Sequence, residues 1–416
     1  MAIPAGHIIT VGGLNVIDRL QDAGLQNPRV PTETIRETGN DLVVGKVLTE
    51  AAFTFQLTSW DTSCDMMALL TGKYGTIEAN KGPAGADAAG TKYKWENCQF
   101  INLACPWARD TGSEGGHIAS GVLVPGYYPS ALSYKFGVTA NAEQTVTLDG
   151  GAYYMAEAYP IEEYAVSTGL ASYETSEEAR VHRIGGFGSE TYRHVFGVTV
   201  NGVLMQEGVD YVEEGGSKPA EASKKVKIKF TTAPTTGAIV KWCYFSDKAH
   251  ELPQAVHANT TIVPAAVRGR NITILVGPVG EQMQLRGIQS FDLNATHTGT
   301  VQREMGTYDP IGYSETGIDA NGTIQIEPKE EAALYAALEK LTGVARTEVF
   351  GYINEHTVPL EAKIYNPKKP SEILKSIRCT DAKLQIPGTA AKVQQVVSLP
   401  LAWESESGTF EEVKGQ

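Results

Sequence analysis

Short stretches in which apolar and polar residues alternate dominate the chain. Residues 51–58 (AAFTFQLT) place Phe53, Phe55 and Leu57 on one side of a segment, and residues 321–327 (NGTIQIE) alternate in the same way. A period of two is typical of a strand that buries one face only. Thr and Val are frequent and there are 43 glycines, which favours many short strands joined by tight turns. These patterns predict a mainly β fold.

Two short segments have helical periodicity. Residues 61–72 (DTSCDMMALLTG) and 328–343 (PKEEAALYAALEKLTG) each follow one of the alternating strands, and both end in LTG. Pro328 at the start of the second segment and Gly343 at its end are typical helix boundaries. The apolar positions on one face of this segment are Leu334, Ala337, Leu338 and Leu341. We therefore expect one short helix after each strand.

The order of these elements occurs twice along the chain. Residues 36–39 (RETG) match residues 303–306 (REMG) at an offset of 267 positions. Repeats that keep the order of their elements usually mark repeated structural units. The sequence therefore predicts two diverged copies of one domain. The other matched pairs, in chain order, are residues 13–20 with 287–294, 51–58 with 321–327, 61–72 with 328–343, 101–109 with 358–367, and 141–148 with 392–399.

A third, smaller module separates the two copies. Asn201 and Gly202 lie between two alternating segments, and this dipeptide is a strong signal for a tight hairpin. Residues 167–190, which precede the hairpin, are polar and Gly-rich and predict a linker or an exposed loop. The predicted fold is mainly β, with two β-sandwich or barrel domains that each carry a short helix, and a small all-β module between them. The predicted domains are residues 1–165, 166–250 and 251–416.

Net charge follows the same division of the chain. The whole chain carries −13, of which residues 1–165 carry −8 and residues 251–416 carry −5, while residues 166–250 are neutral. A protein that grips a duplex normally presents a basic stripe to the phosphates, and none is visible. In residues 224–230 (KKVKIKF) the lysines alternate with apolar residues, which is typical of one polar strand face.

No motif for catalysis, cofactor binding or metal binding stands out. The eight histidines form no HExxH motif and no pair at i, i+4, so a metal site would need residues from distant parts of the chain. The five cysteines are widely spaced without a CxxC motif, and GxSxG is absent. A membrane-spanning apolar run and a signal peptide are not seen. We therefore predict that the chain is not an enzyme and has no catalytic residues, cofactor or metal.

The order of elements in each copy resembles the tail tube fold of bacteriophage tails and related injection systems. In that family a β-sandwich flanked by a helix donates strands to a ring-shaped barrel, and the rings stack into a hollow tube. The resemblance is strongest in residues 334–343 (LYAALEKLTG), 359–367 (PLEAKIYNP) and 393–405 (VQQVVSLPLAWES). It covers about residues 10–165 and 260–416 and leaves out the middle module.

The resemblance implies a structural virion protein, the major tail tube subunit, whose stacked rings form a conduit for DNA ejection. A duplicated subunit is expected to form homotrimeric rings with pseudo-sixfold symmetry. The middle module would decorate the outer wall of a long, non-contractile tail. The implied partners are further copies of the chain, a tape-measure protein and a tail terminator. DNA would pass through the lumen without specific binding, and no membrane insertion is expected. The implied location is the virion tail, after assembly in the cytoplasm of the bacterial host.

Strand alternation predicts which side chains face the channel of such a tube. Carboxylates repel phosphates, so a wall along which DNA slides should be polar or acidic, without Lys or Arg. The same alternation is also typical of a sheet face that is merely solvated. The predicted lumen-facing residues are Thr54, Gln56, Thr58, Glu143, Thr145, Thr147, Thr323, Gln325, Glu327, Gln394 and Ser398.

Two polar segments, residues 20–34 and 404–416, are predicted to join successive rings and to become ordered only on binding. A second hypothesis is another ring-forming virion component, such as a baseplate ring, or a capsid decoration protein or fibre base. A third hypothesis is a carbohydrate-binding or depolymerising enzyme. That function would favour a row of exposed aromatic residues, and the five scattered tryptophans form none.

Overall fold

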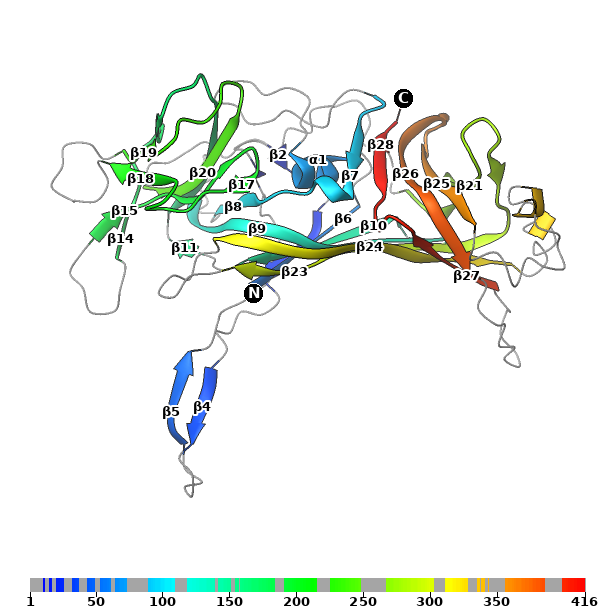
Figure 1. Cartoon of the computed structure of the whole chain (residues 1–416), viewed down its shortest axis with the longest axis horizontal. Helices are drawn as coiled ribbons and strands as arrows, with labels where there is room; N and C mark the ends of the chain where they lie inside the picture. Colours follow the sequence, from blue (N-terminus) through cyan, green and yellow to red (C-terminus); the bar gives the residue numbers. More distant parts are fainter. Residues whose placement is uncertain are drawn as a thin grey trace.

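The computed structural model of the chain is mainly β, as predicted, with antiparallel pairing in its sheets. Figure 1 shows an elongated molecule in which long strands form a continuous layer. The structure describes residues 10–11, 15–16, 20–25, 32–36, 43–48, 53–60, 64–72, 89–108, 118–138, 141–150, 154–156, 158–183, 191–214, 225–247, 267–302, 311–327, 335–336, 338–340, 343, 356–385 and 399–415.

One 17-stranded sheet runs through both halves of the chain. In the first half, five of its strands lie side by side in an order that differs from their order in the sequence. Across the sheet they are β3 (Leu20–Leu25), β6 (Phe53–Ser59), β10 (Glu143–Gly150), β9 (Ile118–Gly137) and β8 (Ile101–Ala108).

The second half repeats this arrangement strand for strand. Each strand of the second half has a counterpart in the first half. Corresponding strands come in the same order along the chain and pair with corresponding strands in the sheet. Across the sheet they are β23 (Ile288–Gln302), β24 (Gly312–Ile326), β27 (Leu399–Ser405), β26 (Lys369–Gln385) and β25 (Thr357–Asn366).

The smaller elements of the two halves correspond as well. In the first half β1 (Thr10–Val11) and β2 (Asn15–Val16) form a hairpin on β8, β11 (Tyr154–Ala156) pairs with β9, and α1 (Asp65–Thr71) follows β6. In the second half β21 (Ile272–Val276) and β22 (Met283–Gln284) form a hairpin on β25, β28 (Glu411–Lys414) pairs with β26, and helical residues 335–336 and 338–340 follow β24. The shared topology supports an internal duplication.

One matched pair from the sequence is displaced in the structure. Residues 141–148 were aligned with residues 392–399, but the strand that lies between β24 and β26, as β10 lies between β6 and β9, is β27 at Leu399–Ser405. Residues 386–398 lie outside the described part of the chain. A period-two pattern looks the same after a shift of two residues, so sequence alone could not fix this register.

Alternating burial explains why the strands of the long layer form. On β6, Phe53, Phe55 and Leu57 are buried, and the intervening side chains are only half-buried. α1 belongs to the same core, with six of its seven residues buried. The helix ends at Gly72, whose φ of 63° is the left-handed conformation that glycine adopts at helix C-termini.

The two halves are joined by direct strand pairing. β9 of the first half pairs with β23 of the second, and the rings of Phe136 and Phe291, which face each other in this register, stack 5.8 Å apart. β28 of the second half also pairs with β7 (Lys92–Lys94) of the first. One hydrophobic core extends through both halves. The halves therefore share a sheet and a core.

A buried ion pair lies in this shared core. Lys375 Nζ on β26 is 3.3 Å from Glu412 Oε1 on β28, and the two side chains are 1% and 0% exposed. The ammonium group also lies 5.1 Å from the centre of the Tyr134 ring on β9 of the first half. A buried charge requires its partner, so this pair favours the observed register of β28.

The C-terminal residues are ordered, which contradicts the prediction that residues 404–416 become ordered only on binding. Phe410 is buried and stacks on Trp95, which opens the 3₁₀ helix Trp95–Asn97. The apolar contact of Phe410 and the buried Glu412 hold this polar segment in place. The prediction for residues 20–34 is also wrong in its described parts, because they form β3 and most of β4 (Thr32–Arg36).

β4 and β5 form a separate hairpin between β3 and β6. β4 pairs with β5 (Val43–Leu48), and Figure 1 shows the hairpin extending away from the rest of the molecule. In the second half the same position in the topology is taken by the distal parts of β23 and β24, which pair as far as Gln302 and Gly312. The first RExG motif begins at Arg36, the last residue of β4, and the second motif, residues 303–306, lies outside the described residues.

The middle module is all-β, as predicted, and its two main sheets form a sandwich. Its β16–β17 hairpin turns at Asn201 and Gly202, whose φ angles of 50° and 76° suit a tight turn of the predicted kind. The larger sheet contains β12 (Tyr159–Val166), β20 (Ile239–Ser246), β16 (Phe196–Val200) and β17 (Val203–Leu204). The smaller contains β13 (Ser172–Glu174), β19 (Lys227–Phe230) and β18 (Tyr211–Glu214). β14 (Val181–Arg183) pairs with β15 (Thr191–Arg193).

The segment predicted as a linker or exposed loop, residues 167–190, contributes to this sandwich instead. β13 pairs with β19, and Tyr173 contacts the rings of Phe230 and Trp242. Tertiary packing of one aromatic side chain outweighs the polar composition of the segment. The larger sheet also includes β12, which the sequence had assigned to the first copy.

Candidate functional site: the polar face of the long sheet

The long layer formed by the two halves has a core face and an opposite face, which we call the polar face. Its side chains alternate with the buried ones along each strand. The polar face comprises Asp22, Thr54, Gln56, Thr58, Ala131, Ser133, Lys135, Glu143, Thr145, Thr147, Asp149, Asp292, Asn294, Thr296, Asp319, Asn321, Thr323, Gln325, Glu327, Lys383, Gln385, Pro400, Ala402 and Glu404.

Each predicted lumen-facing residue that the structure describes lies on the polar face. All of them are half-buried, except Gln325, which is exposed. Gln394 and Ser398 lie outside the described residues. The members that the structure brings together are Thr54, Gln56, Thr58, Glu143, Thr145, Thr147, Thr323, Gln325 and Glu327.

Hydrogen bonds between neighbouring strands hold the short side chains of this face. The hydroxyls of Thr58 and Thr145 lie 3.2 Å apart, and Thr54 Oγ1 donates to Asp149 Oδ1 at 3.0 Å. In the second half Thr323 Oγ1 donates to Asp292 Oδ2 at 3.3 Å. Such cross-strand pairs stabilise a sheet. They also leave a surface of short, ordered groups.

The polar face is acidic. Its carboxylates are Asp22, Glu143, Asp149, Asp292, Asp319, Glu327 and Glu404, and its cations are Lys135 and Lys383. Sequence reasoning missed both lysines because it followed only the strands next to the motifs. Lys383 is paired with Glu406 at 2.8 Å. The excess of carboxylates gives the face a negative potential.

The labelled elements of the core lie on one side of the long layer. Figure 1 shows α1, β7 and β28 beside each other above the layer of β9, β10, β23 and β24, and the strands of the middle module lie towards the same side. The module is anchored there because Phe196 and Phe245 pack with Ala104 and Leu123 of β8 and β9. The polar face is therefore directed away from both α1 and the module.

One end of the layer is an open strand edge. Among the described residues, β3 pairs only with β6, whereas its counterpart β23 pairs with β24 on one side and with β9 on the other. An edge strand presents unpaired N–H and C=O groups that can pair with another chain. The edge of β3 can thus accept a further strand in the way that β23 does.

A hydrogen-bonded cluster crosses the junction of the halves on the core side of this layer. His297 Nδ1 lies 2.9 Å from Glu315 Oε2, and its Nε2 lies 3.1 Å from the carbonyl oxygen of Trp95. Tyr128 donates to the same carboxylate at 3.1 Å. Burial lowers the pKa of His297, although Glu315 opposes this shift. The cluster links β9 of the first half to β23 and β24 of the second.

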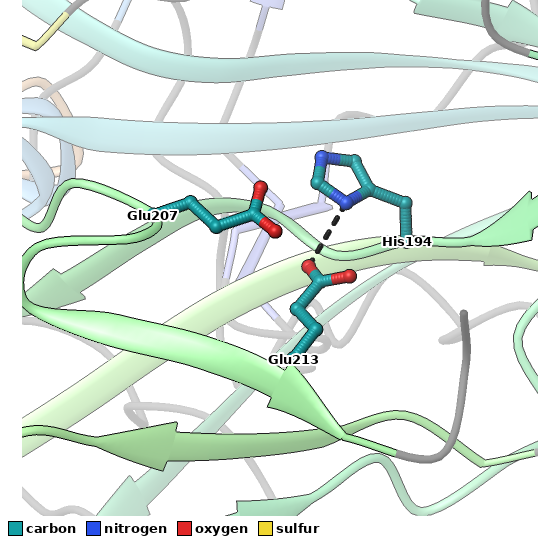
Figure 2. Close-up of side chains that lie close together, drawn as sticks. All are labelled: His194, Glu207 and Glu213. Carbon is teal, nitrogen blue, oxygen red and sulfur yellow. Dashed lines mark ion pairs between the residues drawn. The ribbon is translucent and has the colours of Figure 1, made fainter.

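The middle module brings together one histidine and two glutamates that are distant in the sequence. Figure 2 shows His194, Glu207 and Glu213 pointing toward one another, with an ion pair of 2.9 Å between His194 Nδ1 and Glu213 Oε1. One ligand atom from each of the three lies within 4.8 Å of the others. No motif spacing could have indicated this cluster, because the fold alone creates it.

The cysteines offer little nucleophilic chemistry. All five are free, and burial raises the pKa of Cys105 and of Cys379 to about 12. The thiolate is the reactive form of cysteine. These two thiols therefore stay protonated and act as small apolar core residues.

Neither a protein-family model nor a curated protein matches the chain. Within the described residues, helices are all too short or too polar to cross a bilayer.

Proposed function

We propose that the chain is a tail tube subunit whose rings stack into a hollow conduit for DNA. The pairing of β9 with β23 carries this proposal, because it joins the two copies head to tail. Residues 131–137 of β9, beyond the part that pairs with β8, lie at one end of the layer β3–β6–β10–β9. β23 is the counterpart of β3, which lies at the opposite end of that layer. A contact that joins unlike ends repeats from unit to unit and closes into a ring when the rotation permits.

Under this proposal β3 of one chain pairs with the neighbouring chain in the same way that β23 pairs with β9 within a chain. Each junction between chains then copies the junction within a chain, and the ring acquires pseudo-sixfold symmetry from three chains. Closure would remove the open edge of β3.

The channel width expected from the number of strands favours three chains per ring. Each chain would supply eight strands, namely β3, β6, β10, β9, β23, β24, β27 and β26. For strands about 4.8 Å apart and tilted about 40°, a barrel of about 24 strands has a backbone diameter of about 48 Å, and inward side chains leave about 35 Å. A ring of two chains would leave only about 20 Å by the same arithmetic, which is too narrow for a hydrated duplex.

The polar face would line this channel. Its carboxylates and short hydroxyl and amide groups repel phosphates or bind them weakly, so DNA can slide. The middle module packs towards the opposite side, which supports a place on the outer wall. A tape-measure protein and a tail terminator are the proposed partners, and the virion tail is the proposed location, after assembly in the host cytoplasm.

Negative-stain electron microscopy of the purified chain tests the proposal. We expect stacked rings with a hollow centre and three outer projections per ring. Closed rings that never stack, even at high protein concentration, would favour a baseplate-type component. A chain that stays monomeric at every concentration and salt would contradict a self-assembling tube.

Two proline variants make the test specific for the edge of β3. Successive N–H groups of a strand point to opposite edges, so Ala23→Pro and Gly24→Pro differ in which edge loses its donor. The variant that loses the outer N–H should unfold at nearly the wild-type temperature and fail to form rings. Wild-type rings from both variants would show that β3 is not the contact.

A further inference from the structure

We propose that His194, Glu207 and Glu213 form a binding site for a first-row divalent cation, with Zn²⁺ as the best fit. The three residues come from different parts of the middle module (Figure 2). His194 lies between β15 and β16, Glu207 lies between β17 and β18, and Glu213 lies on β18. The site is independent of the proposed tube function.

The donor atoms are held in place without an ion. Glu213 Oε1 accepts a hydrogen bond from the backbone N–H of Val195 at 3.1 Å and lies 2.9 Å from His194 Nδ1. The His194 ring packs edge-on against Phe196, with ring centres 4.6 Å apart. The side chains of His194 and Glu213 are only 15% and 8% exposed, respectively. Little ordering remains to be done when an ion binds.

Glu207 completes the cluster from a closed turn. The carbonyl oxygen of Gln206 accepts from the backbone N–H of Asp210 at 2.8 Å, and Asp210 Oδ2 accepts from the N–H of Gln206 at 2.9 Å. This reciprocal pair fixes the turn that carries Glu207. The Glu207 side chain is exposed, so an ion can enter and water can take a remaining coordination position.

The donor set selects the class of ion. Zinc binds imidazole nitrogen at about 2.0–2.1 Å and carboxylate oxygen at about 2.0–2.2 Å, so ligand atoms around a tetrahedral ion lie about 3.3 Å apart. The separations of 2.9 Å and up to 4.8 Å in the cluster reach this value with small side-chain movements. An imidazole ligand disfavours Mg²⁺ and Ca²⁺, which prefer oxygen alone. Two carboxylates balance the charge of a divalent ion.

The ion would connect the two sheets of the sandwich. His194 leads into β16 of the larger sheet, and Glu213 belongs to β18 of the smaller one. A module of this size has a small core, and small domains often gain stability from a bound metal. We therefore expect Zn²⁺ to raise the unfolding temperature of the module.

Calorimetric titration of the full chain with Zn²⁺, after treatment with a chelator, tests the site. We expect a saturable site that Glu207→Gln weakens at least tenfold. Glu214→Gln is the matched control, because Glu214 is the next residue on β18 and pairs with Lys229 at 2.8 Å. The control should bind Zn²⁺ like the wild type. Both variants should unfold at nearly the wild-type temperature without metal, since the Glu207 side chain is exposed and the ion pair of the half-buried Glu214 is formed with an exposed lysine.

Co²⁺ distinguishes this site from binding by cysteine. Cobalt at the proposed site should give visible d–d absorption without the charge-transfer bands of a thiolate, and Glu207→Gln should abolish it. Equal Zn²⁺ uptake by the wild type and Glu207→Gln, thiolate bands, or equally tight Ca²⁺ binding would each overturn the proposal.

Discussion

At the scale of single residues, charged side chains buried in the sheet depend on partners from other strands. Glu361 on β25 has a side chain that is 4% exposed. It accepts hydrogen bonds from Arg378 Nε at 2.7 Å and from Gln282 Nε2 at 2.6 Å. Burial raises the pKa of this carboxyl, but the bonds from Gln282 and Arg378 outweigh burial and hold the pKa below its ordinary value of 4.5. The ionised form therefore stabilises the fold.

Glu361 predicts a loss of stability in acid. Because its folded pKa is depressed, its contribution is complete above pH 4.5 and disappears as the pH falls through the folded pKa. We expect Glu361→Gln to lower the free energy of unfolding by about 1–3 kcal/mol at pH 7. Denaturant unfolding at several pH values checks this. The gap between the wild type and the variant should narrow below pH 4.5, and a constant gap would contradict the assigned role.

At the scale of elements, each strand of the long layer has one side buried in the core and one side on the polar face. β6 shows this most simply. Leu57 is fully buried in the core, and its neighbour Gln56 lies on the polar face. The two positions share one backbone environment and differ mainly in the face to which they point.

Leu57 and Gln56 therefore form a matched pair for mutation. Leu57→Ala should lower the free energy of unfolding by about 2–5 kcal/mol, because it leaves a cavity in a well-packed core. Gln56→Ala should change stability by less than about 0.5 kcal/mol. Chemical denaturation of the two variants measures both values. Similar losses in the two variants would mean that the polar face is also packed against protein.

At the scale of the whole molecule, the head-to-tail pairing of the halves and the acidity of the polar face support a ring with a negative channel. The shared core, the Lys375–Glu412 pair and the His297 cluster hold the two halves together, so under the proposed function the chain would enter a ring as one rigid segment. A rigid segment preserves curvature from one subunit to the next. Under the proposed function, closing a ring would need one new kind of contact between chains, at the edge of β3.

Under the proposed function, lysines on the polar face should make the channel retain DNA. We expect assembled Gln56→Lys/Gln325→Lys rings to bind duplex DNA at low salt and to release it as salt rises, because lysines exchange for counterions on phosphates. Cosedimentation of DNA with the rings measures this. Val203→Lys, at a position 59% exposed in the middle module, is a charge control. Equal DNA retention by wild-type rings would argue against the proposed channel.

Much of the fold could be predicted from local patterns. The alternation at Phe53, Phe55 and Leu57 indicated the burial of β6, and the Asn201-Gly202 dipeptide indicated the β16–β17 turn. These signals depend on neighbours in the sequence, which a single chain displays directly. Polar composition gave a wrong prediction for two segments that are held in place by residues distant in the sequence. Tyr173 and Phe410 are each held by aromatic side chains far away in the sequence.

In the candidate sites, too, local patterns predicted some features, and others depend on long-range contacts. Alternation correctly placed Thr54 and its neighbours on one face, since side-chain direction in a strand is a local property. It could not show that Lys135 shares that face, because strand order across a sheet depends on long-range pairing. The cluster of His194, Glu207 and Glu213 was also beyond reach, since two sheets must pack before its atoms meet.

By itself, the sequence determined the mainly β class, the two short helical segments and the existence of a repeated order of elements. Each of these follows from periodicity and turn chemistry, which act over a few residues. Only the tertiary structure decided that the two halves form one sheet, with β9 against β23, and that β3 keeps an open edge. Strand pairing joins residues that are far apart in the chain, and backbone hydrogen bonds carry no sequence label that would identify the partner in advance.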